Sequence, residues 1–97
     1  MGVYNHCTLV GNLTDNPVLT EEGKKKTATF TICVERYAGK DKESDKDYFD
    51  IVTTGKLAEM TMEHLKEGRK VLVDGRMQIN NKKEWKVITD NLKFLRI

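Results

Sequence analysis

The chain has few of the residues that build metal centres, disulfide frameworks or membrane spans. Its 97 residues include two cysteines, two histidines and one proline. No apolar run approaches the roughly 18–20 residues of a membrane helix, and the N-terminus does not resemble a signal peptide. Cys7 and Cys33 both lie in apolar alternating runs, where a free thiol behaves as a small hydrophobic group. These absences argue against a membrane protein and a disulfide scaffold, and they favour a cytoplasmic setting.

Signatures of catalysis are also missing. His6 and His64 are far apart, and neither has the spacing to a cysteine that a zinc site requires. Asp41, Asp45 and Asp47 lack the glycine and the terminal glutamate of a calcium loop. No phosphate-binding glycine loop or nucleophile motif is present. We therefore expect no enzyme, no metal and no cofactor.

Charge is unevenly distributed along the chain. The formal net charge is only +2, but residues 69–97 carry eight basic and three acidic side chains, whereas residues 35–67 carry six basic and nine acidic ones. A weak overall charge with a basic C-terminal third indicates a local anion-binding surface.

Alternation with a period of two predicts strands at 6–13, 27–34 and 47–54. Asn16-Pro17 ends the first strand, after which 18–20 could continue it. Residues 38–46, rich in glycine, serine and mixed charge, are predicted to form a loop. Apolar residues at helical spacing predict a helix over 56–66, which Gly68 terminates.

The basic hairpin predicted over 70–88 carries much of the functional argument. Val71, Val73, Met77 and Ile79 share one phase of its first strand, and 80–82 form the turn. We expect a kink or bulge at Gly75 and no turn there, because the apolar phase continues through it. Trp85 stands among lysines on the second strand, so it either stacks on bases or caps the core, and its phase, shared with Val87, favours burial.

Three strands, a helix and two further strands give the order of an all-β, five-stranded OB-fold (Greek-key) barrel, with the helix between the third and fourth strands. We expect residues 1–97 to form a single such domain. In this fold the second and third strands, with the first and last hairpin loops, bind oligonucleotides. Here the first loop carries Lys24, Lys25 and Lys26, and the last carries Lys82, Lys83 and Trp85, with Lys86 following on the strand. Each lysine run could equally be a solvated surface.

Several stretches, in order, resemble the bacterial single-stranded DNA-binding protein family across nearly the whole chain. They are Leu9-Val10-Gly11-Asn12-Leu13 with Asp15 and Pro17, Phe30 to Val34 with Arg36, Asp47-Tyr48-Phe49, Gly55 to Glu59, Leu65 to Gly68, Val71 to Arg76 in part, and Phe94-Leu95. The resemblance implies an OB-fold homo-oligomer, a tetramer or a dimer. It also implies that the protein coats single-stranded DNA independently of sequence during replication, recombination or repair, as a cytoplasmic, nucleoid-associated protein.

The resemblance also nominates residues for the DNA site. Tyr48 stands where the family keeps its main stacking aromatic, and Arg36 and Lys56 match common basic positions; Arg76 is a further candidate. Arg36 could instead pair with Glu35 or Asp47. The chain departs from the family where Thr54, Ala38 and Lys82 replace aromatic residues. Tyr37, one residue early, and Trp85 are the possible substitutes.

The family normally continues into a flexible tail with an acidic tip that recruits repair and replication proteins. The printed sequence stops at Arg96-Ile97, so either a tail was trimmed or the protein is naturally tailless. Primosomal replication protein N is such a tailless relative. It supports the alternative of an adaptor that binds single strands weakly and helps to assemble replication-restart proteins. A nuclease on the same fold would need clustered carboxylates or metal ligands.

Overall fold

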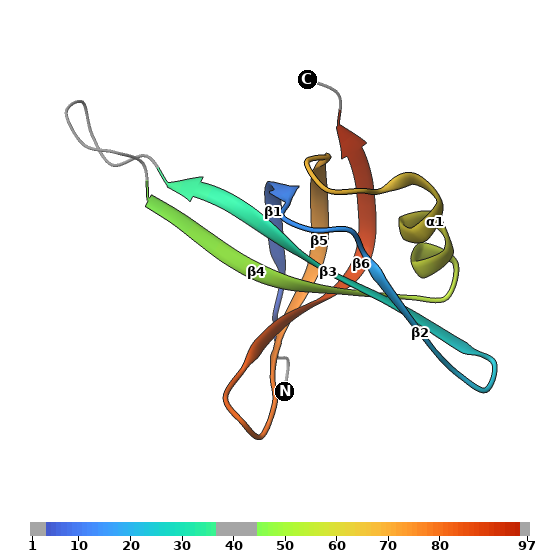
Figure 1. The fold of residues 1–97 in the computed structure, drawn as a ribbon. Coiled ribbons are helices and arrows are strands. Elements are labelled where there is room, and N and C mark those ends of the chain that lie inside the picture. Colours follow the sequence, from blue (N-terminus) through green and yellow to red (C-terminus); the bar gives the residue numbers. More distant parts are fainter. Residues whose placement is uncertain (1–3, 37–44, 96–97) are drawn as a thin grey trace.

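The computed structural model describes residues 4–36 and 45–95, and most of them lie in strands (Figure 1). The elements in chain order are β1 (Cys7–Leu13), β2 (Val18–Glu22), β3 (Lys25–Arg36), β4 (Asp45–Thr54), α1 (Lys56–His64), β5 (Lys70–Ile79) and β6 (Trp85–Leu95). The predicted order of strands and helix is confirmed. Residues 45 and 46, expected in a loop, belong instead to β4, where they pair with the end of β3.

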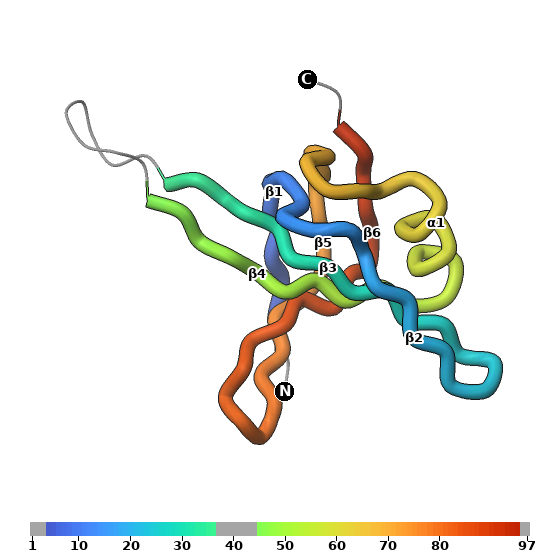
Figure 2. Tube along the Cα trace, viewed as in Figure 1, coloured from blue at the N-terminus to red at the C-terminus, as the bar shows by residue number. Residues whose placement is uncertain are grey.

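The strands form one sheet that curls into a barrel. Its order is β1-β5-β6-β4-β3-β2, and β1 also pairs with β3 through Asn12↔Cys33 and Leu13↔Ile32. All pairings are antiparallel except that of β4 with β6. β1 and β2 are the two halves of the first barrel strand, separated by the bend at 14–17 (Figure 2). The predicted five-stranded OB barrel is therefore confirmed.

The core follows from the alternation of the strands. Ala28, Phe30 and Ile32 on β3 are buried, while the threonines between them stay half-exposed. The other fully buried aliphatic side chains of the strands are Ile51, Val71, Val73 and Val87. A β-branched residue fits this pleated, closely packed surface well. The same alternation leaves the outer sides of β3 and β4 available for a ligand.

Helix α1 covers one end of the barrel, where it contacts β2, β3 and β4 (Figure 1). Ala58 and Thr61 face the core, as does Leu65 just beyond the helix. The predicted helix end was wrong by two residues, because the backbone becomes extended at Leu65 (φ −101°). Gly68, with φ +89°, lies in the turn that follows. Met62 is one of the apolar residues whose helical spacing predicts this helix, yet it is 39% exposed.

A bulge divides the long β5–β6 hairpin. The register shifts between Asp74 and Gly75, as predicted. A Cβ atom at Gly75 would collide with the carbonyl oxygen of Ile88, so the close approach of the two strands requires glycine there. The bulge bends the hairpin, and its distal half extends beyond the barrel wall (Figure 1).

The hairpin closes through the predicted turn. Asn80 Oδ1 accepts hydrogen bonds from the backbone N–H groups of Lys82 (2.8 Å) and Glu84 (3.0 Å), and Lys83 adopts φ +62°. This side-chain-to-backbone turn is the role in which asparagine is favoured. It holds Lys82 and Lys83 at the exposed tip of the hairpin.

Candidate nucleic-acid interface

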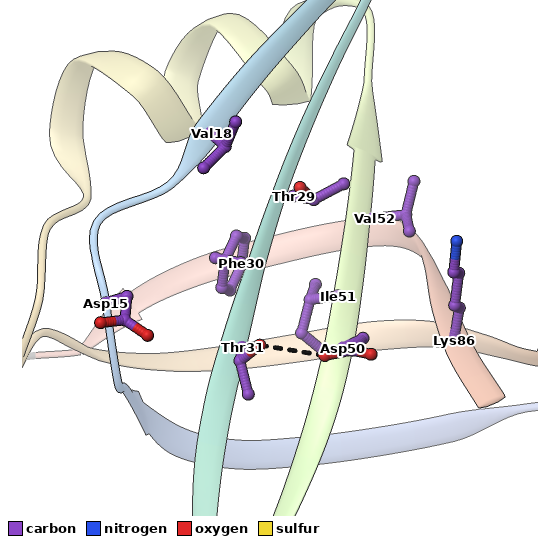
Figure 3. A pocket seen from close by; sticks show the side chains of 9 residues that line it. All are labelled: Asp15, Val18, Thr29, Phe30, Thr31, Asp50, Ile51, Val52 and Lys86. Carbon is purple, nitrogen blue, oxygen red and sulfur yellow. Dashed lines mark hydrogen bonds between the residues drawn. The ribbon is translucent and has the colours of Figure 1, made fainter. Parts of the chain in front are cut away.

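The outer side of β3 and β4 presents a polar surface that continues onto β6. Thr29 pairs with Val52 across the two strands, and Thr31 pairs with Asp50. Because β6 runs parallel to β4 with Lys86 opposite Asp50, the lysine joins the same row. These side chains border a pocket of about 300 Å³ (Figure 3), lined by Asp15, Val18, Thr29, Phe30, Thr31, Asp50, Ile51, Val52 and Lys86. We call this the threonine pocket.

Polar groups in the threonine pocket are partly committed and partly free. Thr31 Oγ1 donates a hydrogen bond to Asp50 Oδ1 at 2.9 Å, the dashed line in Figure 3. In the described part of the chain Lys86 has no ion-pair partner. Asp15 and Lys86 lie on the two sides of the β3–β4 pair in Figure 3. The surface therefore offers both an exposed cation and exposed hydrogen-bond acceptors.

Next to the threonine pocket lies an apolar pocket of about 350 Å³, between β4 and the β5–β6 hairpin. It is lined by Tyr48, Phe49, Asp50, Met77, Trp85 and Val87, and we call it the aromatic pocket. Tyr48 is 62% exposed and Trp85 57% exposed, although a monomer normally covers such large side chains. Tyr48 points outward because it lies on the exposed phase of β4. Of the two interpretations of Trp85, the structure contradicts burial in the core.

Three exposed lysines lie on the hairpin that carries Trp85. Lys82 and Lys83 lie at the tip, and Lys86 follows Trp85 by one residue. Arg76 is on the other hairpin strand, 3.7 Å from the Asp90 carboxylate and more than half exposed. Exposed cations next to exposed aromatic rings are the combination that binds single strands.

Other predicted site residues lie elsewhere. Lys25 and Lys26, expected in a loop, begin strand β3, and only Lys24 lies in the turn. Lys26 Nζ is 3.2 Å from Glu59 Oε1 on α1, so this lysine links the β2–β3 hairpin to the helix. Lys56 opens α1, eight residues after Tyr48, which is on the order of 25 Å along the chain at about 3.3 Å per strand residue.

Arg36 forms the carboxylate pairing that its alternative interpretation expected. Its Nε lies 2.8 Å from Asp47 Oδ2, and its Nη2 lies 3.8 Å from Asp45 Oδ2. The pairing follows from the β3–β4 register, which places Arg36 opposite Asp45. Tyr37 lies outside the described residues.

Sequence reasoning missed the residues that floor the two pockets. Asp50, Thr29 and Thr31 alternate with core residues, and the sequence did not predict them as site residues. Phe49 and Met77 are half-buried, pack against the core and also line the aromatic pocket. The period-of-two pattern did contain this information, because it put Thr31 and Asp50 on the outer phase.

Other chemistry is limited within residues 4–36 and 45–95. No group of three or more histidine, cysteine, aspartate or glutamate side chains there could hold a metal ion. No helix in those ranges has the length and apolar character to cross a membrane. Both cysteines are free thiols, and burial, reinforced by the Asp74 carboxylate, raises the pKa of Cys7 above its ordinary value.

Comparison with known proteins identifies the family. Residues 4–94 match the Single-strand binding protein family. The chain belongs to this family. Its members are non-enzymatic DNA-binding proteins, which confirms the expectation that the chain is not an enzyme. The resemblance inferred from the sequence stretches is likewise confirmed.

Curated members of the single-strand binding family resemble the chain over most of its length. A single-stranded DNA-binding protein of Caldanaerobacter subterraneus is 35% identical, covering 96% of this chain and 69% of its own length. One of Thermotoga maritima is 40% identical, covering 81% of this chain and 59% of its own length.

Solved structures of the family share the fold. The second single-stranded DNA-binding protein of Mycobacterium smegmatis superposes with a TM-score of 0.81 at 21% identity, covering 96% of both chains. The Plasmodium falciparum SSB, solved in complex with single-stranded DNA, gives 0.83 at 21% identity, covering 99% of this chain and 98% of that one.

Proposed function

We propose that this chain binds and protects single-stranded DNA independently of the DNA sequence, as one OB-fold domain acting in replication, recombination or repair. Bases stack on Tyr48 and Trp85 at the aromatic pocket, and the phosphates of the DNA backbone contact the lysines of the β5–β6 hairpin. The observation that carries the proposal is the exposure of these two rings, 62% and 57%, at one pocket, on a hairpin that also carries exposed lysines. Each base stacked on an aromatic ring contributes on the order of 1–3 kcal/mol.

The electrostatic arrangement supports the same proposal. Lys82, Lys83 and Lys86 lie at the tip and on one strand of the hairpin that carries Trp85, and in the described residues none of them forms an ion pair. Phosphates can therefore replace water around these amino groups without breaking existing pairs. Arg36 and Lys26, which have carboxylate partners at 2.8 Å and 3.2 Å, are secondary contributors.

The test is a titration with oligothymidine at low and high salt, recorded by anisotropy of a labelled oligonucleotide and by tryptophan fluorescence together. Trp85 is the only tryptophan, so quenching reports on one place. We expect saturable binding that weakens steeply as salt rises, with strong quenching. A duplex of the same length should bind much more weakly, because its bases are not available for stacking.

The possible results separate the proposal from its alternatives. Binding without quenching would preserve the function but remove Trp85 from the base contacts. Equal affinity for duplex and single strand, or no saturable binding, would reject the coating function. A weak signal that strengthens only with a replication protein present would favour the adaptor that resembles primosomal replication protein N.

Assembly and location complete the proposal. We propose a homotetramer or homodimer in the cytoplasm, associated with the nucleoid, as implied by the resemblance to the family. Light scattering coupled to size-exclusion chromatography measures the mass directly. A particle of 11.2 kDa, the mass of one chain, at micromolar concentration would contradict the oligomer.

A further inference from the structure

The threonine pocket has an unusual charge for a surface that would receive a polyanion. Its charged lining residues are two carboxylates, Asp15 and Asp50, and one amine, Lys86. A phosphate placed over its floor would approach Asp50, an acceptor-only group that repels it. Phosphates are better accommodated at the lysines of the β5–β6 hairpin, so the part of the DNA strand that meets the floor of the threonine pocket is a base.

The geometry leaves Asp50 able to contact that base. Its side chain is on the exposed outer phase of β4, two residues from Tyr48 on the same phase. Thr31 donates to Oδ1 at 2.9 Å and so fixes the carboxylate against β3. In the described residues Oδ2 has no hydrogen-bond or ion-pair partner, and Lys86, its neighbour in register, makes no ion pair with it. One oxygen is positioned and the other is available.

A carboxylate only accepts hydrogen bonds, so it discriminates between bases by the donor groups that each base presents. Cytosine presents an exocyclic N4 amino group where thymine presents the O4 carbonyl. Adenine and guanine also carry exocyclic amino groups. The single ring N–H of thymine lies between two carbonyl oxygens, which a neighbouring carboxylate repels. In a single strand these Watson–Crick edges are open to a protein side chain.

We propose that Asp50, positioned by Thr31, is a specificity-determining residue that favours bases with an exocyclic amino group over thymine at the threonine pocket. The inference rests on the proposed single-strand binding. It adds to that function a graded preference, in which cytosine-rich single strands bind better than the stacking rings alone would allow. The base stacked on Tyr48, or the next base along the DNA strand, directs its edge to the floor of the threonine pocket. There Asp50 accepts a hydrogen bond from the amino group of the base.

The experiment compares labelled oligocytidine and oligothymidine of about 12 nucleotides, within the 4–16 nucleotides that OB folds occupy. The quantity measured is the ratio of the two dissociation constants, thymine over cytosine, at fixed salt and neutral pH. Asp50→Asn keeps the shape but adds an amide donor that suits thymine O4. We expect this ratio to fall about fivefold, because a good base-edge contact is worth at least about 1 kcal/mol.

Two further variants control for charge and for folding. Glu63→Gln removes one negative charge from the exposed side of α1, away from both pockets, and should leave the ratio unchanged. Thr31→Val keeps the β-branched shape and every charge but removes the donor to Asp50. It should lower the ratio by a smaller factor than Asp50→Asn, with a thermal transition close to that of the parent protein.

The outcomes distinguish this inference from the function on which it rests. Binding of both oligonucleotides with the same ratio in the parent and in Asp50→Asn overturns the role of Asp50 and leaves single-strand binding intact. An equal fall in Glu63→Gln assigns the effect to net charge and also overturns it. Failure of the parent protein to bind either oligonucleotide overturns both.

Discussion

Replacing Tyr48 by alanine tests the stacking surface most directly. The ring is 62% exposed, so its removal deletes little buried area, and we expect the free energy of unfolding to change by about 0.5 kcal/mol or less, as for a typical surface substitution. Loss of one base platform costs on the order of 1–3 kcal/mol of binding energy. The dissociation constant for oligothymidine should therefore rise roughly fivefold to 150-fold.

The assay combines anisotropy titration with a thermal melt of each variant. Tyr48→Phe keeps the ring and should bind nearly as the parent does. Met60→Ala removes another exposed apolar side chain, 40% exposed on α1, and should change neither affinity nor quenching. Because Trp85 remains in all of these variants, its quenching shows whether the strand still reaches the hairpin. Parent-like affinity of a folded Tyr48→Ala protein would refute the stacking role.

Combining Tyr48→Ala with Trp85→Ala asks whether the two rings hold one base or two. Both residues line the same pocket of about 350 Å³. If each ring stacks on its own base, the two losses of binding free energy add. If one base contacts both rings, the double variant loses less than the sum, because the first substitution has already removed part of the shared contact.

Three further predictions concern salt, folding and thiol chemistry. Lys83→Ala should reduce the slope of log affinity against log salt by about 0.7, the value for one single-strand phosphate contact, whereas Lys66→Ala beyond α1 should leave the slope unchanged. Gly75→Ala should lower the unfolding free energy by at least about 1–3 kcal/mol in a denaturant titration, because the new Cβ meets the backbone of Ile88; an unchanged midpoint would contradict the bulge geometry. In a variant lacking the other cysteine, Cys7 should alkylate more slowly than free cysteine at pH 8, because its raised pKa lowers the thiolate fraction; an equal rate would contradict that shift.

Strand positions and turns could be predicted because they depend on neighbours in the sequence. The alternation around Phe30 and Ile32 determines which side of β3 is buried, and a single asparagine supplies the acceptor for the turn at 80–84. The bulge at Gly75 was predictable for the same reason, since the apolar phase continued on either side of it.

The pairing of charges could not be predicted in this way. Lys26 and Glu59 are 33 residues apart, and they meet only because α1 covers the barrel end where β3 begins. A lysine run therefore looks the same in the sequence whether its members face DNA or hold a helix. Arg36 is the intermediate case. Its two candidate partners were visible, but the choice of Asp47 depends on the β3–β4 register and on a side-chain direction.

Trp85 shows why core and binding surface are hard to separate on this hairpin. It shares its strand phase with Val87, which is 1% exposed, yet Trp85 itself is 57% exposed. The difference arises because β5 and β6 continue past the bulge and beyond the barrel, so their inner phase loses the opposing strands and opens to solvent. There the apolar period that builds a core builds the aromatic pocket instead, with Met77 half-buried at its base. A residue on that phase is structural or functional according to how far the hairpin extends past the barrel, which is a property of the whole fold and not of the local pattern.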